Sequence, residues 1–311
     1  MTVRRAAAID CGTNSIRLLI ADVDPVVGTA RDVVREMLIV RLGEGVDATG
    51  AFAPAALQRT FAACRSYAET LADAGSPPLR FVATSASRDV SNRAQFVAGV
   101  RDILGVAPEV ISGQEEADLS FLGATVGLPD GVAAPYLVVD IGGGSTEFVL
   151  GTRTPTHRTS VDIGCVRMTE RHLASDPPTP DQVRATIADI DTAIERAGRA
   201  VPLDAAATLV GLAGSVTTVA ALALGLPRYD ATRTHHSRIP RAEVRRVSDA
   251  LLAMPRAQRA ALPVMHPGRV DVIGAGALVL RRIMEATGAA EVLVSEHDIL
   301  DGAVWSVVAG P

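Results

Sequence analysis

Two short segments of this chain, 130 residues apart, repeat one pattern of apolar residues, aspartate, glycine and serine. The first reads AAIDCGTNSIRLLIAD over residues 7–22, and the second reads LVVDIGGGSTEFVLG over residues 137–151. Aligning Asp10 with Asp140 also places glycine on glycine and serine on serine. Each segment predicts a strand, a glycine-rich turn and a second strand. We therefore expect two domains of related topology, each built around one such hairpin, with the two turns facing across an interdomain cleft.

The remaining segments alternate between strand character and helical periodicity, which predicts an α/β fold with mainly parallel sheets covered by helices. We expect strands in residues 37–43, 79–88 and 107–113, and helices in residues 54–75, 92–105, 114–127 and 179–198. Residues 207–225, 271–288 and 291–308 each read as a strand followed by a helix. The turn-rich stretch LPDGVAAP near residue 128 divides the chain into domains 1–128 and 129–311, and the last helix could pack back on the first domain.

Composition excludes several classes of protein. A chain of 311 residues with 48% hydrophobic residues is long enough for two globular domains, and its net charge of −5 does not favour nucleic-acid binding. All 30 basic residues are arginine. The three widely spaced cysteines suit a reducing cytoplasm better than a disulfide framework or a zinc site. The uncharged stretch 205–227 has glycines and hydroxyl residues at its centre, so we expect a buried strand and helix there and no membrane association.

Three consecutive glycines after Asp140 are suited to binding phosphate. Backbone N–H groups can approach a phosphate closely only where side chains do not block them, and the following serine and threonine add hydroxyl donors. A nearby carboxylate can hold Mg²⁺. A tight turn with a bulge is the structural alternative. A Walker loop is excluded because it needs lysine, and a Rossmann fingerprint because a strand follows the glycines here.

The motifs taken together resemble the Ppx/GppA phosphatases, which are exopolyphosphatases and guanosine pentaphosphate phosphohydrolases. The residues that carry this resemblance are DCGTNS at 10–15, TSASR at 84–88, ISGQEEA at 111–117 and DIGGGSTE at 140–147. The resemblance spans the chain and is strongest to the short, two-domain actinobacterial members. It implies two actin-like, ribonuclease-H-like domains of the superfamily that includes acetate and sugar kinases and heat-shock chaperones.

The resemblance also implies roles for individual residues. Glu116 matches the glutamate that activates the attacking water, Glu147 matches a second catalytic carboxylate, and Asp10 and Asp140 are the expected positions for Mg²⁺, or for Mn²⁺ in its place. Arg88 matches a phosphate-contacting arginine. The remaining expected phosphate-binding residues are Gly12, Thr13, Asn14, Ser15, Gly142, Gly143, Gly144, Ser145 and Thr146. The segment SEHDILDG at 295–302 departs from the family pattern, which has glycines and an arginine there.

Three functions remain open at this point: the phosphatase, a sugar or acetate kinase of the same superfamily, and a non-catalytic nucleotide-binding regulator. Within the phosphatases, scarce aromatic residues favour inorganic polyphosphate over guanosine pentaphosphate, whose base needs a pocket. Residues 228–246 carry six arginines and two histidines against two acidic residues, and they form either a solvated basic face or a track for a long polyanion. The resemblance also suggests a homodimer.

Overall fold

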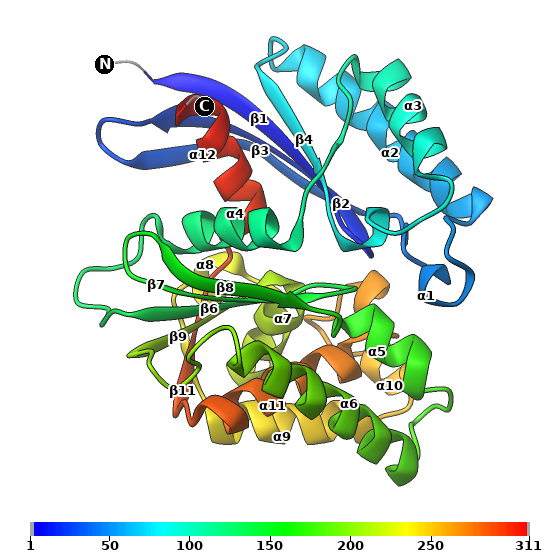
Figure 1. Ribbon diagram of the computed structural model, residues 1–311, viewed down its shortest axis with the longest axis vertical. Helices are drawn as coiled ribbons and strands as arrows, with labels where there is room; N and C mark the ends of the chain where they lie inside the picture. The colour runs from blue at the N-terminus through cyan, green and yellow to red at the C-terminus, as the bar shows by residue number, and fades with distance from the viewer. Residues whose placement is uncertain (1–2, 310–311) are drawn as a thin grey trace. The chain divides into compact units, whose positions relative to one another are not determined.

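Residues 3–309, which the computed structural model describes, form two α/β units (Figure 1). One unit comprises the chain up to Gly127 together with the residues from Ile299 onward, and the other comprises Leu128–Asp298. The chain therefore passes from the first unit to the second at residue 127 and returns at residue 299. The sequence predicted the boundary one residue later, and it counted residues 299–311 with the second domain while allowing the last helix to pack back on the first.

The first unit contains a five-stranded sheet with the order β3-β2-β1-β4-β5. Strands β1, β2 and β3 form an antiparallel meander, whereas β4 is parallel to β1 and β5 is parallel to β4. Their bounds are β1 Arg4–Cys11, β2 Ser15–Asp24, β3 Thr29–Ile39, β4 Leu79–Ala83 and β5 Glu109–Val110. Strand β3 begins well before the predicted 37–43. The prediction missed its first residues because they are exposed at the edge of the sheet and show no apolar alternation.

Helices cover both faces of this sheet, and the alternation of side chains along β1 shows how. Ile9 and Cys11 face a core shared with α2 (Pro54–Asp73) and α3 (Arg93–Leu104). Ala6 and Ala8 face the opposite way and contact α12 (Ile299–Ala309), which packs beside α4 (Gly113–Thr125) in Figure 1. Small side chains at these positions allow α12 to lie close to the strand. The short helix α1 (Val46–Thr49) and the 3₁₀ turn η1 (Ser85–Ser87) complete the unit.

The second unit contains a six-stranded sheet with the order β10-β11-β9-β6-β7-β8. Its strands are β6 Tyr136–Ile141, β7 Thr146–Gly151, β8 Pro155–Val161, β9 Thr208–Leu212, β10 Arg238–Pro240 and β11 Glu291–Val294. Counted from β8, the first five strands repeat the order of the first unit: an antiparallel meander β6-β7-β8, then β9 and β11 parallel to β6. The predicted internal repeat and fold class are confirmed.

Seven helices of the second unit lie within the part of the chain that the structure describes. They are α5 Cys165–His172, α6 Pro180–Gly198, α7 Ala213–Ala223, α8 Ala231–Thr234, α9 Arg241–Ala253, α10 Arg256–Ala260 and α11 Ile273–Thr287. The uncharged stretch 205–227 is strand β9 followed directly by α7, as predicted. Among the described residues, no helix combines the length and the apolar character that crossing a membrane requires.

The strand predicted at the start of residues 271–288 is wrong, because this segment enters helix α11 at Ile273 without a preceding strand. Gly274 and Gly276 lie in the first turn of α11. A Cβ atom on Gly276 would lie 2.2 Å from the Ser215 hydroxyl oxygen and 3.2 Å from the Cys165 Cβ. This glycine therefore allows α11 to pack closely against its neighbours. The sequence alone does not distinguish a glycine used for helix packing from a glycine in a turn.

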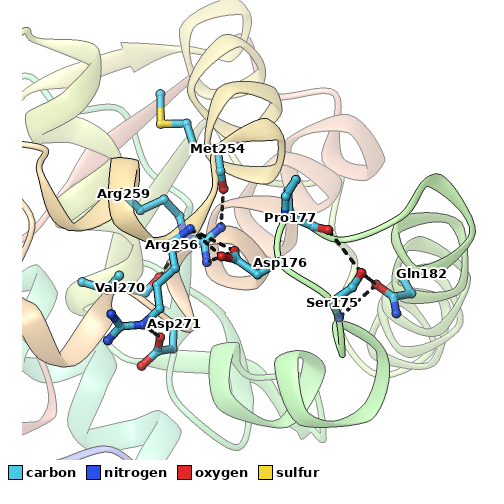
Figure 2. A network of polar contacts seen from close by, with 9 residues as sticks. All are labelled: Ser175, Asp176, Pro177, Gln182, Met254, Arg256, Arg259, Val270 and Asp271. Atoms are coloured by element: carbon cyan, nitrogen blue, oxygen red, sulfur yellow. Dashed lines mark hydrogen bonds and ion pairs between the residues drawn. The ribbon is translucent and has the colours of Figure 1, made fainter.

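A buried arginine joins three connections of the second unit (Figure 2). Arg259 donates hydrogen bonds to the backbone carbonyls of Met254 and Val270 and to the Asp176 carboxylate. The same carboxylate accepts the backbone N–H of Arg256, whose side chain pairs with an aspartate. This network fixes the backbone of the segment that precedes α11 at Val270. Arg269 is the residue before Val270, so its backbone position is restrained as well.

Candidate active site

The glycine turn of the second unit directs its carbonyl groups toward helix α5. The carbonyl of Gly142 accepts the N–H of Cys165, and the carbonyl of Gly143 accepts the N–H groups of Val166 and Arg167. The carbonyl of Gly144 accepts the Nε–H of Arg167 at 2.7 Å. The N–H groups of residues 143–145 have no acceptor within the described part of the chain. A turn with its acceptors engaged on one side and its donors available on the other is an anion-binding arrangement.

The two hydroxyl groups that follow the glycines are already engaged within the protein. Ser145 Oγ donates to Glu147 Oε1 at 2.8 Å, and the Thr146 hydroxyl donates to the carbonyl of Ile163. A hydroxyl has one proton to donate. The expectation that these hydroxyls add donors for phosphate is therefore not met in this arrangement, and the backbone N–H groups supply the donors instead.

Asp140 and Glu147 form a pair of buried carboxylates on neighbouring strands. They are direct partners in the antiparallel register of β6 and β7, so both side chains lie on the same face of the sheet. Their exposed fractions are 6% for Asp140 and 1% for Glu147. Two buried carboxylates that lie side by side are suited to a divalent cation, which takes oxygen ligands and completes its shell with water and phosphate oxygens.

The turn of the first unit has the same backbone design. Gly12 donates its N–H to the Ser15 carbonyl at 3.0 Å, as Gly142 does to Ser145. The carbonyls of Thr13 and Asn14 accept N–H groups from the segment that follows β3, and the Thr13 hydroxyl lies 3.0 Å from that of Ser85. The predicted phosphate-binding residues 12–15 therefore form a single turn at the end of β1 and the start of β2.

The aspartate of this first turn has a different partner. Asp10 lies opposite Arg17 in the register of β1 and β2, the position that Glu147 occupies in the second unit. Arg17 donates from Nη2 to Asp10 Oδ2 at 2.6 Å and from Nε at 3.1 Å. The guanidinium supplies the positive charge that a cation would otherwise provide. This salt bridge weighs against the predicted role of Asp10 as a direct metal ligand.

Glu116 and Arg88 are brought together in the first unit. Glu116 begins the first turn of α4, whose N-cap residue Ser112 accepts the N–H of Glu115. Arg88 follows η1, donates from Nε to the carbonyl of Ile111 at 3.1 Å, and donates from Nη2 to the Glu116 carboxylate. A carboxylate in the first helical turn is stabilised by the helix dipole, and this one is 7% exposed.

Glu115 has a structural role on the surface. It is half-exposed and accepts a hydrogen bond from Arg80 at 2.6 Å. The neighbouring acids of the QEEA motif therefore separate into one buried and one exposed carboxylate.

Three residues of the second unit near the glycine turns were not identified from the sequence. Arg167 contacts the Gly144 carbonyl as described above. Arg269 packs against Gly214 at the start of α7, because a Cβ on Gly214 would overlap its guanidinium. Cys165 lies beside the turn, but burial raises the pKa of its thiol, so it is not a reactive thiolate. An alignment of relatives is the signal that could have identified the two arginines.

His297 of the segment that departs from the family pattern forms a cluster with two histidines of residues 228–246. The ring of His235 stacks on His236 with centroids 3.6 Å apart and lies 4.6 Å from that of His297. Glu296 donates its N–H to His235 Nδ1 and accepts hydrogen bonds from the hydroxyls of Tyr229 and Thr234. In the described part of the chain no three or more histidine, cysteine or acidic side chains are arranged to hold a metal ion.

The arginines of residues 228–246 are partly neutralised by neighbouring acids. Arg238 pairs with Glu291, and Arg245 and Arg246 of α9 pair with acids on the same helix. Pairs of this kind on an exposed surface contribute little stability and break readily.

Comparisons with known proteins agree with one another. The family model described as the Ppx/GppA phosphatase family matches residues 19–309. Exopolyphosphatase 2 of Mycobacterium tuberculosis is 53% identical to this chain over 318 residues, with 99% of each chain covered. The crystal structure of an exopolyphosphatase-like protein has a TM-score of 0.93 at 46% identity and covers 97% of this chain and 98% of its own. A Ppx/GppA family member from Aquifex aeolicus has a TM-score of 0.80 at 28% identity, covering 99% of this chain and 98% of its own.

The shared fold, the sequence identity across nearly the whole chain and the match of the family model lead to one conclusion, which confirms the resemblance inferred from the motifs. This chain belongs to the Ppx/GppA phosphatase family.

Proposed function

We propose that this protein is an exopolyphosphatase, a hydrolase that releases the terminal phosphate of inorganic polyphosphate. The glycine turn at residues 142–145 is the observation that carries the proposal. Within the described residues the N–H groups of residues 143–145 are available, while the carbonyls of the three glycines are bound to α5. Gly12 supports it: a Cβ there would have ordinary contacts of 3.6 Å, so the fold itself does not require glycine. The relative from M. tuberculosis named exopolyphosphatase 2 supports the same activity.

The first unit supplies the base in this mechanism. Glu116 accepts a proton from the attacking water, and Arg88 binds an equatorial oxygen of the terminal phosphate. Arg88 is held from Nε by the Ile111 carbonyl and from Nη2 by Glu116. Within the described residues its Nη1 makes no hydrogen bond and is available for the phosphate. Positioning and charge stabilisation dominate phosphoryl transfer, so this rigid arginine is suited to the task.

The second unit supplies the residues for a cation. Asp140 and Glu147 fit Mg²⁺ or Mn²⁺, because they are a same-face pair of buried carboxylates, whereas Asp10 is bound by Arg17. When bound, the cation would neutralise charge on the phosphates. The N–H groups of residues 143–145 bind phosphate oxygens at the turn between the two strands that carry this pair.

Polyphosphate is favoured over guanosine pentaphosphate because the aromatic residue next to the glycine turn is not positioned to stack on a base. Phe148 is the aromatic residue that follows the turn, but it is fully buried in the core of the second unit and cannot contact a base. The exposed arginines of α9 support a long polyanion as substrate. Replacing Arg241, Arg245 and Arg246 together by Ala should raise KM for long polyphosphate and leave KM for triphosphate unchanged. An equal effect on both substrates would mean that these arginines form only a solvated face.

A phosphate-release assay tests the proposed function. The purified protein is given long-chain polyphosphate, with and without ADP or a sugar as acceptor. Release that does not depend on an acceptor is the expected result. Transfer to ADP or to the sugar would indicate a kinase, and no turnover of any kind would indicate a regulator. If guanosine pentaphosphate gives the higher kcat/KM, the protein is a guanosine pentaphosphate phosphohydrolase. A cytoplasmic location and a homodimer remain predictions.

A further inference from the structure

Three polar side chains form a row across neighbouring strands of the second sheet. Asp140 of β6 is paired in register with Glu147 of β7, and Glu147 is paired with Ser160 of β8. Residues directly opposite each other in antiparallel strands point to the same face. Ser160 therefore lies on the face that carries the two carboxylates, although it is distant from them in sequence and belongs to no motif.

Ser160 is bonded to the middle member of this row. Its Oγ donates to Glu147 Oε1 at 2.7 Å, and Ser145 Oγ donates to the same oxygen at 2.8 Å. Two donors that arrive from different elements fix both the position of that oxygen and the plane of the carboxylate. Hydrogen bonds to a charged acceptor are stronger than those between neutral groups, so this constraint is substantial.

The first unit provides an internal comparison. The equivalent row across β1, β2 and β3 is Asp10, Arg17 and Met37. There the middle residue is a cation, and the third position has no hydroxyl. The hydroxyl thus occurs in the repeat whose middle residue is a carboxylate. This pattern connects Ser160 with the function of Glu147 and not with the packing of the sheet in general.

We propose that Ser160 is a positioning residue for Glu147, which it holds as a fixed anion that orients the cation of the active site. The two hydroxyl protons on Oε1 fix the orientation of the Glu147 carboxylate, which gives it a static role, while Glu116 is the base in the proposed mechanism. This inference rests on the proposed function and assigns a different task to each carboxylate. It predicts that loss of the hydroxyl weakens metal binding as well as catalysis.

The test uses the full-length protein with three substitutions on β8. Ser160→Ala removes the hydroxyl, and Ser160→Thr retains it on a residue that strands accommodate well. Thr159→Ala is the matched control, because the neighbouring residue faces the opposite side of the strand. Mn²⁺ binding is measured without substrate by titration followed by electron paramagnetic resonance. Phosphate release from polyphosphate is measured at several substrate and metal concentrations.

We expect Ser160→Ala to weaken Mn²⁺ binding and to lower kcat, each by about 10-fold, as is typical when a residue that orients a metal ligand is lost. KM should change little, Ser160→Thr should restore both quantities, and Thr159→Ala should resemble the wild type. Wild-type Mn²⁺ affinity in Ser160→Ala, or no Mn²⁺ binding by the unaltered protein, would overturn the inference. Failure of the unaltered protein to release phosphate would instead reject the proposed function, because metal affinity is measured separately.

Discussion

Replacing Gly164 should displace the glycine turn without disturbing the local backbone. This residue precedes α5 in an extended conformation, with φ −139° and ψ 163°, which any residue can adopt. A Cβ added there would lie 2.3 Å from the Gly143 carbonyl oxygen and 2.5 Å from the Gly144 nitrogen. Backbone atoms cannot rotate away as a side chain can, so reaching an acceptable contact requires the turn to move by about 0.7 Å or more.

Gly164→Ala should therefore affect catalysis more than stability. Forcing an extra methyl group into a packed site costs about 1–3 kcal/mol, partly offset by about 0.4–1 kcal/mol from the lower entropy of the unfolded chain. A displacement of about 1 Å in a positioning element can reduce turnover by about 100-fold. We expect kcat on polyphosphate to fall by about 10- to 100-fold, while the melting temperature falls by only a few degrees.

Gly198→Ala is the matched control in the same unit. A Cβ on Gly198 would lie 3.6 Å from Leu203, which is an ordinary contact, and alanine is favoured over glycine at the end of α6. Phosphate release gives kcat, and hydrogen exchange of residues 142–146 reports directly on the turn. Normal kcat in a folded Gly164→Ala protein would refute the reasoning, because the turn could then move without loss of function.

Other predictions concern the base, the cation and the histidine cluster. Glu116→Gln should reduce kcat by about 10²–10⁴-fold with substrate affinity retained. Glu115→Gln should have near-normal kcat in the same assay. Near-normal kcat in Glu116→Gln would exclude Glu116 as the base. Chelation of Mg²⁺ and Mn²⁺ should abolish phosphate release, and full activity in excess chelator would contradict a carboxylate-held cation. Burial and His297 lower the pKa of His236 below 6.5, so its neutral form stabilises the fold above pH 6.5 and this stability is lost as the pH falls through the lowered pKa. His236 has a φ of 60°, which asparagine tolerates. His236→Asn should therefore fold and should reduce the loss of melting temperature below pH 6.5. An unchanged loss of melting temperature would show that His236 is not the titrating group.

Sequence predicted the repeat and most of the helices because these have strong local signals. The hairpins show apolar runs around a glycine turn, and α2 and α6 show clear helical periodicity. The sequence indicated candidate site residues only where a motif marks them, as at Glu116 and the glycine turn. Ser160 and Arg17 contact their partners across strands, and pairing in register cannot be read from a single chain before the strand order is known. The Arg17 salt bridge therefore changed the interpretation of Asp10, although both residues lie within the first quoted segment.

The position of α12 has a consequence for the order in which the molecule can form. The second unit is one continuous stretch, Leu128–Asp298, so it can fold as soon as that stretch has left the ribosome. The first unit is synthesised earlier, but Ala6, Ala8 and Leu19 on one face of its sheet are covered by Leu300 and Val304 of α12. That apolar face stays uncovered until residues 299–309 have been translated. The first unit is therefore begun before the second unit and completed after it.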